Sequence, residues 1–270
     1  VVIREMTRLP FYWIDAFTSH AFGGNPAAVV PLEAWLPDAE LQQMALQHGL
    51  SETAYLVPME DGGCQLRWFT PGREVDLCGH ATLAAAAVLF TKFPDQDQIN
   101  FSSQSGPLQV RRDTQGRYEL DFPSRPPLPV ASSEATEELL AALGVSSADW
   151  IGKSRDHFVV LPNQAAVAAL TPDFARMKRF DAASVIVTAP GDDHDFISRN
   201  FAPGYGIDED PVTGSSYCTL TPYWAERLQK KSLRARQIST RGGDLWCTLA
   251  DDRVKIAGHA VTYLQGELTY

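Results

Sequence analysis

Short runs of β-branched and aromatic residues, separated by Gly, Pro and Asp, recur along the chain and indicate many short strands. In the first half we predict strands at residues 11–17, 28–32, 53–57, 65–69, 98–102, 108–112 and 118–122. In the second half we predict them at residues 157–161, 184–188, 195–201, 245–249, 254–256 and 260–268. Helical spacing of apolar residues predicts helices at residues 38–48, 82–92, 133–143, 172–178 and 215–230, with Asp38 as a candidate cap of the first.

Two of the predicted helices, 82–92 and 215–230, are long and apolar on most faces. A helix of this kind must be surrounded by other elements. We therefore expect an α+β fold of two pseudo-symmetric halves, each a β-barrel-like curved sheet wrapped around a central α-helix.

A repeated motif supports this division. The pattern R-x-F-x-P-G-x-x-[VI]-D begins at Arg67 and again at Arg199, about half the chain further on. Each copy is followed by a glycine-containing loop and then by a helical run. The same order of elements after both copies favours a duplicated architecture.

The Pro-rich segment 123–129 is the natural crossover between the halves. We predict an N-terminal half at residues 1–124, with Glu52 and His80, and a C-terminal half at 125–257, with Asp210 and Ser215. The C-terminal strand, about 258–270, has the option of packing back onto the N-terminal half.

Composition narrows the function classes. The 270 residues carry 33 acidic and 23 basic side chains, a net charge of −10, which disfavours a nucleic-acid partner. No apolar stretch reaches the roughly 18 residues of a membrane span. The N-terminus lacks a signal-peptide pattern, and Met6 is a candidate natural start. Four cysteines without a C-x-x-C pair favour a reduced, cytoplasmic protein.

The starts of the two central helices are candidate binding sites. Each helix follows a glycine, at Gly79-His80 and Gly214-Ser215. Helix N-termini offer unpaired N–H groups and positive dipole ends. Two of them facing each other across a cleft would bind one anionic group, typically a carboxylate. The alternative for each glycine alone is a tight turn and nothing more.

Three titratable residues are candidates for chemistry, and each also has a purely structural interpretation. Glu52 stands at the start of a predicted strand, where a solvated position is the alternative. His80 lies in the glycine turn and could simply bond a carbonyl. Asp210 precedes a proline, as turn and cap residues do. A carboxylate in an apolar cleft can have its pKa raised and shuttle a proton.

Other functional motifs are missing from the sequence: there is no G-x-S-x-G, H-E-x-x-H, P-loop or strand-linked G-x-G-x-x-G. The run Gly191 to Asp195, with Asp192, Asp193 and His194, has the composition of a metal site. Because it lies between two predicted strands, we interpret it as a solvated turn without a metal.

Several segments together resemble the phenazine-biosynthesis isomerase (PhzF-like) family, within the diaminopimelate epimerase-like fold superfamily. The matching pieces, in family order, are D-A-F-T from Asp15, F-G-G-N-P-A from Phe22, L-S-E-T-A from Leu50, R-W-F-T-P from Arg67, D-L-C-G-H-A-T from Asp76 and D-E-D-P-V-T-G-S from Asp208.

The resemblance implies an isomerase that needs no metal or organic cofactor, has its site between the two halves and forms a homodimer. It implies Glu52 as the proton shuttle, with His80 and Asp210 as further catalytic residues. It implies carboxylate binding by the amides of Gly79 and Gly214 and by Ser215, and substrate placement by Asn25. The substrate itself is not fixed by the pattern, beyond a small carboxylate-bearing molecule.

The related racemases use two facing cysteines. Cys78 occupies the first position, before the glycine turn, but no thiol stands near Pro211, where we expect the second. Cys78 is therefore interpreted as a small buried residue. Two alternatives to the isomerase stay open: an amino-acid racemase or epimerase using Cys78 with a non-thiol partner, and a catalytically silent carboxylate-binding protein.

Overall fold

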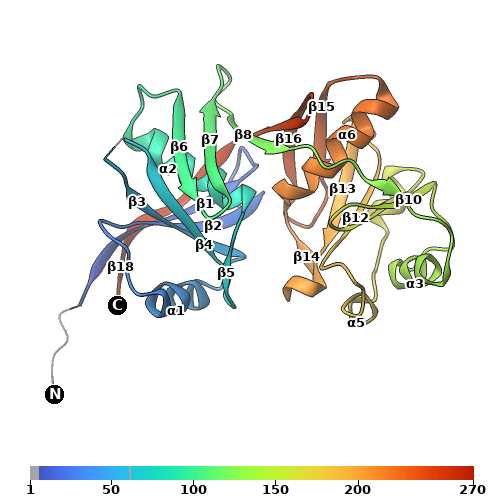
Figure 1. The fold of residues 1–270 in the computed structure, drawn as a ribbon, viewed down its shortest axis with the longest axis horizontal. Coiled ribbons are helices and arrows are strands. Elements are labelled where there is room, and N and C mark those ends of the chain that lie inside the picture. Colours follow the sequence, from blue (N-terminus) through green and yellow to red (C-terminus); the bar gives the residue numbers. More distant parts are fainter. Residues whose placement is uncertain (1–5, 61) are drawn as a thin grey trace. The chain divides into compact units, whose positions relative to one another are not determined.

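The computed structural model describes residues 6–60 and 62–270, so the expectation about residues 1–5 lies outside the described part. The chain folds into two compact units, residues 1–121 with 258–270 and residues 122–257 (Figure 1). Both are mixed α/β structures dominated by strands, as the sequence predicts.

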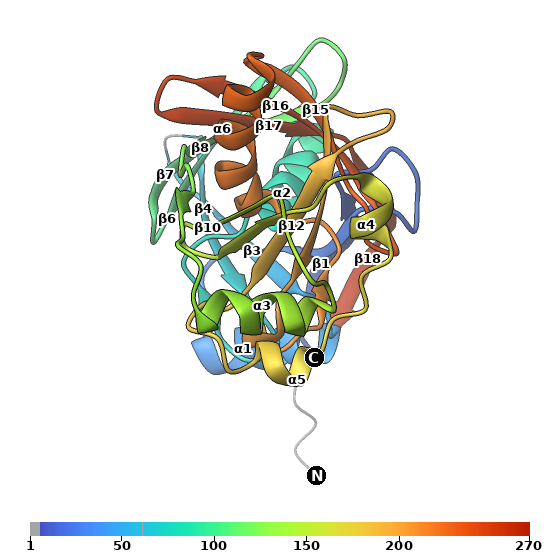
Figure 2. The same ribbon diagram turned by 90° about the vertical axis from the view of Figure 1, so that its right-hand side faces the viewer.

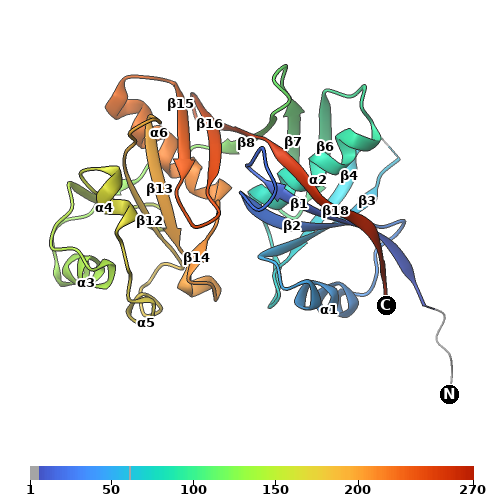
Figure 3. The same cartoon turned by 180° about the vertical axis from the view of Figure 1, so that it is seen from behind.

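The sheet of the first unit alternates antiparallel and parallel neighbours. Its elements are β1 (Arg8–Ala16), β2 (Asn25–Pro31), α1 (Asp38–His48), β3 (Glu52–Pro58), β4 (Cys64–Phe69), β5 (Glu74–Val75), α2 (Gly79–Lys92), β6 (Gln98–Ser103), β7 (Gly106–Arg112), β8 (Tyr118–Pro123) and β18 (Ala260–Thr269). The pairs β2–β3 and β4–β6 are parallel, whereas β1–β2, β3–β4, β4–β5, β6–β7 and β7–β8 are antiparallel. The last strand of the chain, β18, runs antiparallel along β1 (Figure 3).

Helix α2 is the centre of this unit. Every residue from Gly79 to Phe90 is buried, and the helix contacts strands β1, β2, β3 and β6. Four consecutive alanines let the surrounding strands approach the helix closely. A second cluster, which includes Leu41, Tyr55 and Phe69, packs α1 against the outer face of β3 and β4.

The second unit repeats this order of elements. Its elements are β9 (Leu128–Pro129), α3 (Glu134–Leu143), β10 (Trp150–Lys153), β11 (His157–Val160), α4 (Gln164–Ala168), α5 (Phe174–Met177), β12 (Val185–Pro190), β13 (Phe196–Phe201), η1 (Pro203–Tyr205), β14 (Glu209–Asp210), η2 (Gly214–Ser216), α6 (Tyr217–Leu228), β15 (Ser232–Gln237), β16 (Gly243–Ala250) and β17 (Arg253–Gly258). As in the first unit, two pairs of strands are parallel. They are β11–β12, and β13–β15, which precede and follow helix α6 in the sequence. The pairs β10–β11, β12–β13, β13–β14, β15–β16 and β16–β17 are antiparallel.

Helix α6 takes the place of α2, and it begins with the short 3-10 turn η2. On the other side of the sheet, α3, α4 and α5 pack on a core that includes Val187, Ile197 and Phe201 (Figure 2). Helix α3 has a reciprocal capping box between Ser133 and Thr136, which explains its sharp start.

The main departures from the sequence expectations are at element ends and in short elements. Helix α2 begins three residues earlier than predicted, and the predicted helix at 172–178 is reduced to the single turn of α5. Strands β10 and β15, helix α4 and the two-residue strands were not predicted. Asp38 does not cap α1: Pro37 is the N-cap, and Asp38 lies in the first turn, where its charge still favours the helix dipole.

Candidate active site

In the first unit, strand β3 and helix α2 bring Glu52 and His80 together. Glu52 is the first residue of β3, and His80 is the second residue of α2. The Oε2 atom of Glu52 lies 3.2 Å from Nε2 of His80, within ion-pair distance but not aligned as a hydrogen bond. The Glu52 side chain is 18% exposed and that of His80 is 5% exposed. The structure therefore brings the sequence-predicted pair together in a largely buried position.

His80 is held in its neutral form. Burial lowers its pKa to about 3, because the imidazolium would have to give up its hydration. The Nδ1 atom lies 3.3 Å from the side-chain amide nitrogen Nδ2 of Asn25, which can only donate. This contact assigns Nδ1 as the acceptor and Nε2 as the protonated nitrogen, facing Glu52.

Asn25 is fixed by the glycine-rich loop that precedes β2. The side chain of Asn25 is fully buried, and Gly24 before it has a left-handed backbone with φ of 63°. A Cβ atom at Gly24 would lie 2.0 Å from the carbonyl oxygen of Ala16. The buried carboxylate of Asp15 accepts a hydrogen bond from the backbone N–H of Phe22 at 3.0 Å and closes the loop. The F-G-G-N sequence is thus a backbone requirement for placing Asn25.

Cys78 belongs to the same cluster. It is buried at the N-cap of α2, and its Sγ lies 3.5 Å from Nδ1 of His80. The side chain does not cap the helix, so the first-turn amides, including that of Gly79, are not satisfied by it. Candidate ligand atoms of Glu52, Cys78 and His80 all lie within 4.8 Å of one another, a donor set that Zn²⁺ accepts.

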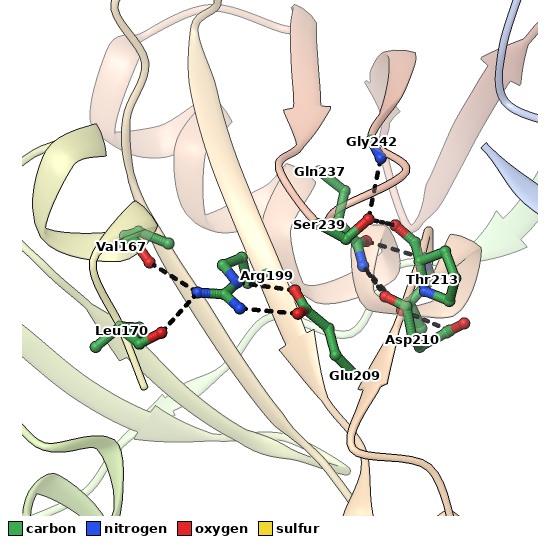
Figure 4. Close-up of polar contacts among 10 residues, drawn as sticks. Val167, Leu170, Arg199, Glu209, Asp210, Thr213, Gln237, Ser239 and Gly242 are labelled. Atoms are coloured by element: carbon green, nitrogen blue, oxygen red, sulfur yellow. Dashed lines mark hydrogen bonds and ion pairs between the residues drawn. The ribbon is translucent and has the colours of Figure 1, made fainter. Parts of the chain in front are cut away.

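In the second unit, the segment from Asp210 to Gly214 forms a tightly bonded turn before α6 (Figure 4). The hydroxyl of Thr213 donates to Oδ2 of Asp210 at 2.6 Å. The side-chain amide of Gln237 donates to the carbonyl of Asp210 at 2.6 Å and accepts from the N–H of Thr213 at 2.9 Å. Ser239 donates to the carbonyl of Pro211 at 2.7 Å. Asp210 therefore stands on a rigid support.

Ser215 follows this turn, at the start of the helical segment. Its hydroxyl oxygen accepts a hydrogen bond from the guanidinium of Arg155 at 3.2 Å. Arg155 is partly exposed and also lies 3.3 Å from the buried carboxylate of Asp156. The positively charged side chain of Arg155 therefore lies beside the predicted binding residue Ser215. The sequence analysis did not identify Arg155.

Two arginines clamp the strands that lead into the helices. Arg67 binds both carboxylate oxygens of Glu74, at 2.7 and 2.6 Å, and Arg199 binds both of Glu209, at 2.8 Å each. In Figure 4, Arg199 also reaches the carbonyls of Val167 and Leu170. Both arginines belong to the repeated motif, so the repeat was the available signal for their role. No sequence signal marked Gln237.

The strand register corrects the alignment of the two motif copies. Phe69 pairs with Glu74, and Phe201 pairs with Glu209, so the second copy has a longer loop before its short strand. The last two motif positions, matched by sequence at Ile207 and Asp208, are therefore not equivalent. By the same register, the equivalent of Cys78 is Thr213, two residues after the place near Pro211 where we expected it.

The acidic turn at Gly191 to Asp195 connects β12 and β13, as predicted. His194 contacts Asp244 at 2.9 Å, and Asp195 contacts Lys230 at 2.7 Å. The side chains of His194 and Asp195 are therefore engaged in polar contacts within the unit. The expected lack of a metal there stays a prediction.

Comparison with known proteins agrees with this architecture. The model of the phenazine biosynthesis-like protein family matches residues 14–266. A protein of Pseudomonas aeruginosa named an uncharacterized isomerase is 50% identical over 97% of this chain and 98% of its own length. The crystal structure of a PhzF-family protein from Enterococcus faecalis is 46% identical, with a TM-score of 0.92 over 97% of this chain and 99% of that one.

The fold and the match along almost the whole chain define a PhzF-like isomerase. The chain belongs to the phenazine biosynthesis-like family. A hydroxyproline epimerase from Agrobacterium vitis is similar in fold alone, with 11% identity and a TM-score of 0.61 over 99% of this chain and 93% of that one. Among the described residues, no helix has both the length and the apolar character to cross a bilayer.

Proposed function

We propose that the protein is a cofactor-independent isomerase that transfers a proton on a small carboxylate-bearing substrate, with Glu52 as general acid and base. The observation that carries this proposal is the contact between Glu52 and a buried, neutral His80 at the start of α2. His80 orients the carboxylate, and Asp210 serves as the acidic group of the second unit.

The protonation of His80 decides which residue shuttles the proton. A general base works best when its pKa is near the operating pH. With a pKa lowered to about 3, the imidazole of His80 is a poor proton acceptor at neutral pH. Its Nε2 lies 3.2 Å from Oε2 of Glu52, so the carboxylate is the group left to take up and return the proton.

The substrate carboxylate binds at the helix starts in this proposal. The amides of Gly79 and Gly214 lie in the first turns of α2 and η2, where N–H groups lack helical acceptors. Ser215 and Arg155 add a hydroxyl and a cation. Asn25, already 3.3 Å from His80, helps to place the substrate.

The larger-scale features of the family resemblance are also part of the proposal. We infer that residues 1–124, with the C-terminal strand at about 258–270 packed back onto them, and residues 125–257 are two pseudo-symmetric domains, and that the protein is a cytoplasmic homodimer. The identical order of strand pairings in the two units supports the pseudo-symmetry. Light scattering that gives one 29.7 kDa chain per particle would contradict the dimer.

Solvent-exchange measurements test the reaction. The protein is incubated in D₂O with L-proline, trans-4-hydroxy-L-proline and dihydro-hydroxyanthranilate, each as a separate probe. Deuterium entering a carbon position of any probe supports proton transfer. Crystals soaked with the same panel should show the carboxylate at the helix starts. A probe that binds there but never exchanges would favour the silent binding protein.

One observation favours a second candidate, an amino-acid racemase or epimerase. Cys78 stands at the helix N-cap, 3.5 Å from the ring of His80, in a position suited to a thiolate. Its counterpart Thr213 offers a hydroxyl bonded to Asp210. Under this reading, the loss of Cys78 rather than of Glu52 abolishes exchange.

A further inference from the structure

One buried side chain forms hydrogen bonds to both ends of the turn that contains Asp210. Gln237 is the last residue of β15 and has no exposed surface. Its amide nitrogen donates to the carbonyl of Asp210 at 2.6 Å, and its amide oxygen accepts from the N–H of Thr213 at 2.9 Å (Figure 4). A buried amide is expected to be satisfied, and Gln237 uses both ends of its own amide on this one turn.

The first unit shows which part of this support is common to both turns. There, Ser105 donates to the carbonyl of Asp76 at 2.8 Å, just as Ser239 donates to the carbonyl of Pro211 at 2.7 Å. The parallel registers of β4–β6 and β13–β15 make Ser105 and Ser239 equivalent positions. One serine contact is therefore the repeated device for holding the turn before a central helix.

Gln237 is the part that is not repeated. By the same registers its counterpart is Ser103, whose hydroxyl bonds the carbonyl of Gly106 in its own hairpin instead. Ser103 therefore does not play the part of Gln237 in the first unit. The second unit adds one at the turn where a carboxylate and a hydroxyl, those of Asp210 and Thr213, lie 2.6 Å apart.

The clamp determines how these two side chains meet. Thr213 can donate to Asp210 only while the backbones of the two residues keep their spacing, and Gln237 ties the carbonyl of one to the N–H of the other. We propose that Gln237 is a positioning residue that sets the orientation of the Asp210 carboxylate for catalysis. This inference rests on the proposed function of Asp210.

Two substitutions at Gln237 test it. Gln237→Leu removes both contacts, whereas Gln237→Glu keeps an acceptor for Thr213 but loses the donor and adds a charge beside Asp210. Ser239→Ala removes only the support that both units share. Gln96→Glu adds the same charge at an exposed position of the first unit and is the matched control.

The first measurement needs no substrate. Hydrogen exchange of the Thr213 amide should be at least about tenfold faster in Gln237→Leu and close to wild type in Gln237→Glu, Ser239→Ala and Gln96→Glu, because only the leucine removes the acceptor. Crystal structures should show the Asp210 carboxylate turned away from Thr213 in both Gln237 variants. An unchanged Thr213 amide and an unmoved carboxylate would overturn the proposal.

The second measurement separates positioning from general stability. With a probe that the wild type exchanges, kcat should fall about ten- to a hundredfold in Gln237→Leu with KM nearly unchanged, because misplacing a catalytic group affects the reaction step. Gln237→Glu should in addition move the pH profile toward higher pH, since a second carboxylate disfavours ionisation of the first. A parallel loss of thermal stability and activity, without either signature, would mean that Gln237 is only structural.

These outcomes remain distinct from a failure of the proposed function. If the wild type exchanges none of the three probes, the isomerase proposal fails for this class of substrate. The Thr213 amide and the carboxylate orientation still decide whether Gln237 holds the turn. If Gln237→Leu does not fold, Gln237→Glu, which keeps size and one contact, decides through the carboxylate position and the pH profile.

Discussion

At the scale of single residues, the arrangement around His80 assigns different tasks to neighbouring groups. The ring is buried and neutral, its Nδ1 faces Asn25 and Cys78, and its Nε2 faces Glu52. In the proposed mechanism, a buried, neutral ring held at Nδ1 serves as an orienting group. In the proposed mechanism, the proton-transfer role falls on Glu52, an ionisable group that is both close to His80 and partly exposed.

We predict that Glu52→Gln abolishes exchange while leaving ligand binding in place. A general base contributes roughly a hundred- to ten-thousandfold in rate, and glutamine keeps the shape but cannot accept the proton. The measurement is deuterium incorporation into a probe that the wild type exchanges, together with binding of the same probe. Cys78→Ala is the matched comparison and should lower the rate of deuterium incorporation only slightly. If Cys78→Ala abolishes exchange and Glu52→Gln does not, the racemase candidate is correct.

The burial of His80 also predicts how stability depends on pH. Its pKa is about 3 in the folded protein and about 6.5 when unfolded, so the unfolded chain binds more protons between these values. Stability from this residue is complete above pH 6.5 and is lost as the pH falls toward 3. Between pH 6.5 and 5 the loss should be about 2 kcal/mol.

Urea unfolding at the two pH values measures this loss in the wild type and in His80→Asn. Burial also lowers the pKa of His48 and of His157, and both contribute in the same direction in either protein. The difference between the two pH dependences isolates His80. Equal losses in the two proteins would show that His80 is protonated in the folded state.

At the scale of elements, the loop before β2 is set by backbone geometry. Gly24 and Gly49 both have left-handed backbones, with φ of 63° and 65°. A Cβ at Gly24 would collide with the carbonyl of Ala16, whereas a Cβ at Gly49 would meet nothing within 4 Å. Alanine at Gly49 therefore carries only the free-energy cost of the left-handed backbone. Alanine at Gly24 carries that cost and also the cost of the steric clash with Ala16.

We predict that Gly49→Ala lowers the free energy of unfolding by about 1 kcal/mol, the cost of a left-handed backbone for alanine. Gly24→Ala should lower it by about 3 kcal/mol or more, since the backbone must also shift. Urea denaturation of both variants provides the comparison. Similar losses in the two would mean that the loop relaxes easily and that Asn25 is not held by it.

Elements with a regular hydrophobic pattern were predictable from the sequence, and those defined by distant contacts were not. The buried helix α2 and strands such as β3 and β13 follow directly from apolar runs. The two-residue strands β5 and β14 have no pattern of their own and exist because they pair with the end of a longer strand. The early start of α2 reflects Gly79 and His80, which are weak helix formers in isolation but are buried here.

At the scale of the whole chain, the two units share the contacts that hold their turns but differ at the candidate site positions. The arginine–glutamate clamps and the serine contacts occur in both units. The positions equivalent to Glu52, Cys78 and His80 are instead Ser184, Thr213 and Ser215 by strand register and turn spacing. Sequence motifs pointed to the candidate site residues because these lie near glycines and prolines. They could not find Gln237, whose role depends on a strand pairing.

At the scale of the whole protein, we predict that activity does not depend on a metal ion. Protein purified without chelator should contain less than one equivalent of transition metal, and dialysis against EDTA should leave exchange unchanged. Among the described residues, Glu52, Cys78 and His80 are placed so that they could bind a metal, and the turn at Gly191 to Asp195 has the composition of a metal site; in both places the protein supplies competing partners. Nδ1 of His80 faces the side-chain amide of Asn25, and His194 and Asp195 contact Asp244 and Lys230. A metal would have to displace these contacts. Elemental analysis of the wild type, Cys78→Ala and His194→Gln measures the metal content. A stoichiometric metal that is lost in one variant would locate the metal site. If activity were lost together with that metal, the cofactor-independent mechanism would be contradicted.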